Sequence, residues 1–157
     1  MSDQIWRVYL SGEVHTNWRR MILEESRKAE LPVEFFAPVT EHNASDNCGS
    51  EILGGESKSF WVDHKSASVN AIRTRTLIEK ADLVVVRFGE KYKQWNAAFD
   101  AGYAAALGKS LITLHDPENG HALKEVDAAA LAVAENPEQV VQLLSYVING
   151  KLPIRNG

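Results

Sequence analysis

The sequence has little of what marks a secreted, metal-binding or membrane protein. Its single cysteine, Cys48, excludes an internal disulfide and a multi-cysteine zinc site, and indicates a reducing compartment. No long apolar run follows the first six residues, so we expect neither a signal peptide nor a membrane anchor. The five histidines lack metal-ligand spacing, and we expect no metal and no other cofactor. These absences predict a soluble, cytoplasmic protein.

The sequence also lacks an excess of positive charge. Lys and Arg number 17 against 21 Asp and Glu, which gives a net charge of −4, and the basic residues are scattered among acidic ones. A surface that binds nucleic acid polymers needs a basic patch, so such partners are not expected. What the chain does have is 157 residues of 45% hydrophobic composition, which suits one domain over residues 1–157 with a single core.

Strand and helix patterns alternate along the chain. Apolar and β-branched runs predict five strands, and helical periodicity with capping residues predicts the helices between them. Residues 40–64 are polar, show little periodicity and are expected to form a long loop. The expected strands are residues 5–10, 33–39, 83–88, 110–115 and 131–134; the expected helices begin at Thr16 or Asn17, at 67, at 96 and at Pro137, and end at or before Pro32, at 80, at 107 and at 148.

This alternation predicts an α/β fold with a five-stranded parallel, doubly wound sheet of the Rossmann or flavodoxin kind. Right-handed crossovers place helices on both faces of such a sheet. The expected strand order is 2-1-3-4-5, in which the chain reverses direction between strands one and three. Open α/β sheets bind ligands at the carboxyl ends of the strands on either side of that reversal.

Two polar turns and the start of one helix would line the predicted crevice. After strand one come Ser11, Gly12 and Glu13, and after strand three come Phe88, Gly89 and Glu90. Helical spacing brings three residues of the next helix onto neighbouring turns, and these are Asn96, Asp100 and Tyr103.

Asp100 is the candidate nucleophile of this helix. The helix dipole should keep a carboxylate ionised in the first turns, although a surface Asp that only complements the dipole would show the same pattern. Gly102, inside the helix, suggests a close approach of another backbone. Phe99 and Leu107 are expected to face the core.

Several motifs resemble the nucleoside 2-deoxyribosyltransferase superfamily, and its small YtoQ-like branch in particular. These motifs are ADLVVV at residues 81–86, RTR at 73–75, WNAAFD at 95–100, FDAGYA at 99–104 and Gly108-Lys109. The resemblance implies a Rossmann-like domain that cleaves the N-glycosidic bond of nucleosides or nucleotides through a glycosyl-enzyme intermediate. It also implies a homo-oligomer.

Two catalytic positions follow from the resemblance. The nucleophile of the family, a Glu, falls on Asp100, whose side chain is one methylene shorter, and the Tyr that orients it falls on Tyr9. As a hypothesis, Asp100 attacks C1′ while Glu13 or Glu90, with a raised pKa, protonates the departing base.

Other residues are candidate substrate contacts. Ser11 and the amides near Gly12 could hold a hydroxyl or a phosphate, and Arg73 could neutralise a nucleotide, whereas Arg75 is as well explained by structure. Trp95 could stack on a base or close a hydrophobic edge. A non-catalytic module that binds nucleotides or sugar phosphates, and a purely structural oligomer subunit, are the competing hypotheses.

Overall fold

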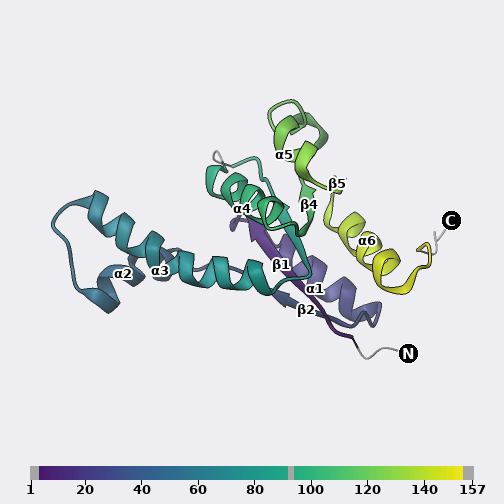
Figure 1. The fold of residues 1–157 in the computed structure, drawn as a ribbon, viewed down its shortest axis with the longest axis horizontal. Helices are drawn as coiled ribbons and strands as arrows, with labels where there is room; N and C mark the ends of the chain where they lie inside the picture. The colour runs from purple at the N-terminus through teal and green to yellow at the C-terminus, as the bar shows by residue number, and fades with distance from the viewer. Residues whose placement is uncertain (1–3, 92–93, 154–157) are drawn as a thin grey trace. The chain divides into compact units, whose positions relative to one another are not determined.

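A computed structural model describes residues 4–91 and 94–153 and shows an α/β fold (Figure 1). The strands are β1 (Trp6–Gly12), β2 (Val33–Phe36), β3 (Leu83–Arg87), β4 (Ser110–Leu114) and β5 (Ala132–Ala134). The helices are α1 (Trp18–Lys28), α2 (His42–Leu53), α3 (Ser59–Lys80), α4 (Trp95–Ala106), α5 (Lys124–Ala129) and α6 (Pro137–Asn149), with a short 3-10 helix at Pro117–Asn119.

The chain divides into two compact units. One consists of residues 1–36 and 81–157 and holds the whole sheet, and the other consists of residues 37–80 and holds α2 and α3. One domain over the full length remains a prediction.

The sheet has the predicted topology. All neighbouring strands pair in parallel, in the order β2-β1-β3-β4-β5 (Figure 1). Ser11 pairs with Val86 and Gly12 with Arg87, so β1 and β3 end level with each other. Their carboxyl ends form the expected switch point of the sheet.

Helices cover both faces of the sheet because its strands are apolar on both sides. On one face, Val8, Leu10 and Val85 form a buried cluster with Trp18 of α1 and Leu144 of α6. Successive side chains of a strand point to opposite faces, so the alternate residues of β1 and β3 lie on the other side, where α4 packs. Three fully or nearly fully buried alanines of α4 allow this packing to be close: Ala97, Ala101 and Ala104.

The prediction of a loop over residues 40–64 was wrong. In the unit of residues 37–80, α2 and α3 contact each other, and Glu41 begins α2 by accepting hydrogen bonds from the backbone N–H groups of Asn43 (3.0 Å) and Ala44 (2.6 Å). The seam between the helices is made by small residues. An added Cβ on Gly49 would lie 2.6 Å from the backbone nitrogen of Ser66. A helix that packs through glycine and polar groups has no apolar stripe for a sequence pattern to reveal.

Smaller differences concern the ends of elements and the faces of helices. Strand one continues through Gly12, strand two ends at Phe36, and the helix at Lys124–Ala129 was not predicted. Phe99 is 62% exposed and Leu107 is 43% exposed, so neither faces the core as expected. No helix within the described residues is long and apolar enough to span a membrane.

Candidate active site

The carboxyl end of β1 brings Ser11 against α4. The fully buried Ser11 donates a hydrogen bond from Oγ to Oδ2 of Asp100, 2.6 Å away. Tyr9 lies two residues earlier on the same face of the strand and is also fully buried. The sequence-predicted trio of Tyr9, Ser11 and Asp100 therefore shares one face of the sheet, at the predicted end.

The helix dipole was expected to keep Asp100 ionised, but Asp100 lies too far along α4 for this effect. It lies five residues after Trp95, where α4 begins, and the dipole acts mainly within the first turn. Burial raises the pKa of Asp100, and the hydrogen bond from Ser11 opposes that rise. The carboxyl group is therefore partly desolvated, with one strong hydrogen bond that favours its ionised form.

Glu13 is held in place as a hydrogen-bond acceptor, an environment that disfavours the proton-donor role expected for it. Its carboxylate accepts hydrogen bonds from the backbone N–H of His15 (2.9 Å), from the backbone N–H of Thr16 (3.2 Å) and from the Thr16 hydroxyl. Burial by itself would raise the pKa of Glu13, but these hydrogen bonds and the charge of Arg87 lower it overall. A carboxylate so stabilised stays ionised at neutral pH.

Arg87 brings a positive charge to the strand ends that sequence reasoning missed. Its Nε lies 3.5 Å from Oε1 of Glu13, and its side chain is only 17% exposed. The one available signal was its position, because it is the only charged residue in the apolar strand Leu83–Arg87. The pair neutralises the two charges where β1 and β3 end.

The turn after β1 is clamped by α1. Arg19 donates to the carbonyl oxygens of Leu10 (3.0 Å), Gly12 (3.1 Å) and Glu13 (2.7 Å), while Trp18 Nε1 also donates to that of Glu13 (2.9 Å). Burial lowers the pKa of Arg19 to about 10, against the opposing effects of Tyr9 and Glu13. Because every bond ends on a backbone carbonyl, the clamp fixes the path of the turn.

Glu90 is the second glutamate that was proposed as a proton donor, and its environment differs from that of Glu13. It is exposed, and a hydrogen bond with Asp116 together with the charge of that residue raises its pKa. The charge of Glu118 adds to the rise, and the charge of Arg87 opposes it. A carboxyl group next to other carboxylates keeps its proton more readily.

The remaining predicted contacts are placed as follows. Phe88 is buried, and an added Cβ on Gly89 would lie 2.7 Å from Cγ of Glu13, so Gly89 packs against the Glu13 side chain. At the start of α4, Trp95 is 73% exposed and Asn96 is exposed. Tyr103 is partly buried.

Two further expectations concern Arg73 and Gly102. Arg73 belongs to the unit of residues 37–80, where its guanidinium donates to the carbonyl oxygen of Ala37 (3.2 Å). The expected close approach at Gly102 is not found among the described residues, none of which lies within 4 Å of an added Cβ there. Among the residues that the structure describes, no group of three or more His, Cys, Asp or Glu is arranged to hold a metal.

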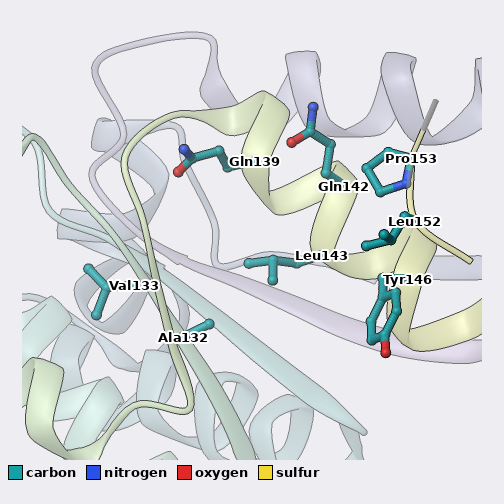
Figure 2. Close-up of a pocket in the computed structure, with 8 residues that line it drawn as sticks. All are labelled: Ala132, Val133, Gln139, Gln142, Leu143, Tyr146, Leu152 and Pro153. Carbon is teal, nitrogen blue, oxygen red and sulfur yellow. The ribbon is translucent and has the colours of Figure 1, made fainter. Parts of the chain in front are cut away.

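A cavity of about 460 Å³ lies in the unit of residues 1–36 and 81–157 (Figure 2). Side chains of β5, of α6 and of residues 152–153 line it, among them Val133, Leu143 and Tyr146. It contains none of the predicted site residues and no titratable carboxyl group. The chemistry therefore points to the ends of β1 and β3 rather than to this cavity.

Comparisons with known proteins agree with the fold. The family profile described as nucleoside 2-deoxyribosyltransferase YtoQ matches residues 9–148. A protein of Bacillus subtilis strain 168, described as uncharacterized protein YtoQ, is 44% identical over 140 residues, which cover 89% of this chain and 95% of the relative.

Two solved structures share the fold at low sequence identity. A conserved protein from Enterococcus faecalis V583 matches with a TM-score of 0.62 and 13% identity, over 92% of this chain and 99% of that one. A 2-deoxyribosyltransferase from Bacillus psychrosaccharolyticus matches with a TM-score of 0.54 and 16% identity, over 86% and 90% of the two chains.

Proposed function

This chain belongs to the nucleoside 2-deoxyribosyltransferase YtoQ family, and from that premise we propose that it cleaves or exchanges the N-glycosidic bond of a nucleoside or nucleotide. The proposed nucleophile is Asp100. The observation that supports this role is the 2.6 Å hydrogen bond from the buried Ser11, which aims the Asp100 carboxyl group at the carboxyl end of β1. Ligands of this fold class bind at that end of the sheet.

The proposed reaction has two displacement steps at C1′ of the sugar. In the first, Oδ1 of Asp100, the oxygen not held by Ser11, attacks C1′, and the electron pair of the C1′–N bond leaves with the base. In the second, water or the nitrogen of another base attacks C1′, the bond to Asp100 breaks, and the attacking group loses its proton. Two inversions give net retention.

Glu90 is the proposed proton donor to the departing base, and it recovers a proton from the second attacking group. The pKa of Glu90 is raised by Asp116, whereas that of Glu13 is lowered, so Glu90 is the better proton donor of the two. Glu13 takes the role of a positioning residue that joins the turn after β1 to Arg87. Tyr9, buried on the same face as Ser11, is proposed to orient Asp100.

Other residues are proposed to bind substrate. The amides of Gly12 and Gly89 would contact the sugar beside Phe88, and the exposed Trp95 and Asn96 would contact the base together with Tyr103. Arg73 remains the proposed contact for a nucleotide phosphate.

We also infer that the protein forms a homo-oligomer in the cytoplasm and uses no cofactor.

The proposal is tested by incubating the protein with a panel of nucleosides and nucleoside monophosphates and measuring the free base by chromatography. Asp100→Asn should reduce base release by at least roughly 1000-fold, since it removes the nucleophile while retaining the shape of the side chain. Asp46→Asn, at an exposed position of α2, is the matched control and should leave the rate unchanged.

A 2-fluoro nucleoside, which forms the intermediate faster than it is hydrolysed, should leave a glycosyl adduct on the peptide that contains Asp100, detected by mass spectrometry. Undiminished activity of a folded Asp100→Asn protein would overturn the nucleophile assignment. Calorimetric binding of nucleotides without release of any base would instead identify the alternative, a non-catalytic nucleotide or sugar-phosphate module.

A further inference from the structure

A buried polar cluster lies at the carboxyl end of β4. Thr113 is fully buried and His115 is 2% exposed, and both point to the side of the strand on which α5 lies. From α5, the carboxylate of Asp127 accepts a hydrogen bond from the Thr113 hydroxyl (2.8 Å) and lies 2.9 Å from Nε2 of His115. None of these three side chains has a part in the reaction proposed above.

The hydrogen-bond partners of His115 determine how many protons it carries. Nδ1 lies 2.7 Å from the carbonyl oxygen of Asp116, which can only accept, so Nδ1 carries a hydrogen. Nε2 faces both carboxylate oxygens of Asp127, at 2.9 and 3.0 Å, so a proton also lies between Nε2 and Asp127. His115 and Asp127 together therefore hold one proton more than a neutral imidazole and an ionised carboxylate would hold.

That extra proton belongs on the imidazole. Asp127 already accepts from the Thr113 hydroxyl, and hydrogen bonds to a carboxylate favour its ionised form. The imidazolium uses both of its N–H groups on oxygen acceptors, so neither charge is left without a partner in the interior. The side chains of His115 and Asp127 are 3% and 17% exposed, and removing one partner of a largely buried charge pair is strongly destabilising.

The cluster is connected to the proposed site by two routes. His115 forms a hydrogen bond through Nδ1 with the carbonyl oxygen of Asp116, and the side chain of Asp116 forms a hydrogen bond with Glu90. In addition, α5 contacts α4, the helix that carries Asp100, as well as β4. The charged groups that shift the pKa of Glu90 are Asp116, Glu118 and Arg87, so a shift of Asp116 would change the local charge around Glu90.

We propose that His115 and Asp127 form a buried imidazolium–carboxylate pair that fixes the end of β4 and thereby positions Asp116 against Glu90. Both are positioning residues, because neither is placed to touch substrate. The existence of the ion pair stands on the geometry alone, whereas its effect on catalysis rests on the function proposed for Glu90. The two parts are tested separately.

The ion pair is tested by ¹⁵N NMR of the full-length, histidine-labelled protein near neutral pH. Both ring nitrogens of His115 should give the signals of a protonated nitrogen, and one should change to an unprotonated signal in Asp127→Asn, whose amide can donate to a neutral Nε2. His121→Asn, at an exposed position, serves to assign the spectrum. An unprotonated Nε2 in the wild-type protein would overturn the proposal without any variant having to fold.

The positioning role is tested by a double-mutant cycle. Asp127→Asn should lower kcat by roughly 10- to 100-fold with little change in KM, and should cause little further loss in a Glu90→Gln background. Equal losses in both backgrounds, or an unchanged kcat, would overturn the positioning role while leaving the ion pair intact. If the wild-type protein releases no base but shows the doubly protonated His115, the proposed function fails and the ion pair stands.

Discussion

Glu13 and Asp100 are two buried or partly buried carboxyl groups at the same strand ends, and their surroundings move their pKa values apart. Glu13 accepts from two backbone N–H groups and the Thr16 hydroxyl beside Arg87, and its pKa falls. Asp100 accepts a hydrogen bond from the Ser11 hydroxyl, and its pKa rises because of burial. Such separation is how one site assigns different roles to chemically similar groups.

The lowered pKa of Glu13 predicts a pH-dependent contribution to stability. Its pKa in the folded protein lies below the ordinary 4.5, so its stabilising effect is present above that value and is lost as the pH falls through the folded pKa. Glu13→Gln should therefore lower the free energy of unfolding by about 1–3 kcal/mol near neutral pH, and by less at about pH 3.5. Chemical denaturation at both pH values measures the difference.

Glu34→Gln, at an exposed position of β2, is the control for this prediction and should change stability by less than about 0.5 kcal/mol at either pH. A Glu13→Gln protein that loses the same stability at both pH values would show that packing, rather than ionisation, explains the effect.

Within single elements, the structure requires glycine at position 12 but does not require it at position 102. Gly12, where β1 ends, has a φ of +112°, and an added Cβ would lie 2.1 Å from the carbonyl oxygen of Arg87. Gly102 lies inside α4 and faces open space.

The two glycines therefore predict opposite effects of substitution by alanine. Gly12→Ala should cost more than about 3 kcal/mol, because both the backbone conformation and the steric clash oppose it. Gly102→Ala should instead stabilise the protein by about 0.5–1 kcal/mol, since alanine is the better helix former. Thermal unfolding measures both, and destabilisation by Gly102→Ala would reveal a partner at that position.

The elements that could be predicted from sequence are those whose hydrophobic pattern follows from burial. Residues 83–86 form an apolar run because β3 is covered on both faces. Asn136 caps α6, as its position before Pro137 suggests, and its side chain accepts a hydrogen bond from the Gln139 N–H at 2.9 Å. The short α5 follows no such pattern, and it is held by the Asp127 hydrogen bonds to β4. Long-range polar contacts of this kind are not visible in local sequence.

At the scale of the whole molecule, the position of the site was more predictable than its electrostatics. Topology alone brings Ser11 to the strand ends, and helical spacing brings Asp100 to the same place, so their contact follows from the strand order. The charge state of Glu13 depends on the conformation of the turn that aims two N–H groups at it. No sequence pattern specified that conformation, so the choice between Glu13 and Glu90 as the acid was left open by the sequence.

The exposed apolar side chains of residues 37–80 predict that the protein self-associates. The α2–α3 seam is built from small residues, and Ile52, Leu53, Phe60 and Trp61 are 48–70% exposed. Clustered exposed apolar side chains on a folded chain usually mark an interaction surface. Sedimentation should give a mass that is a multiple of 17.4 kDa, and Phe60→Glu with Trp61→Glu should shift it toward the monomer. Leu152→Glu, at an exposed position near the β5 cavity, is the control; a wild-type monomer at all concentrations would contradict the prediction.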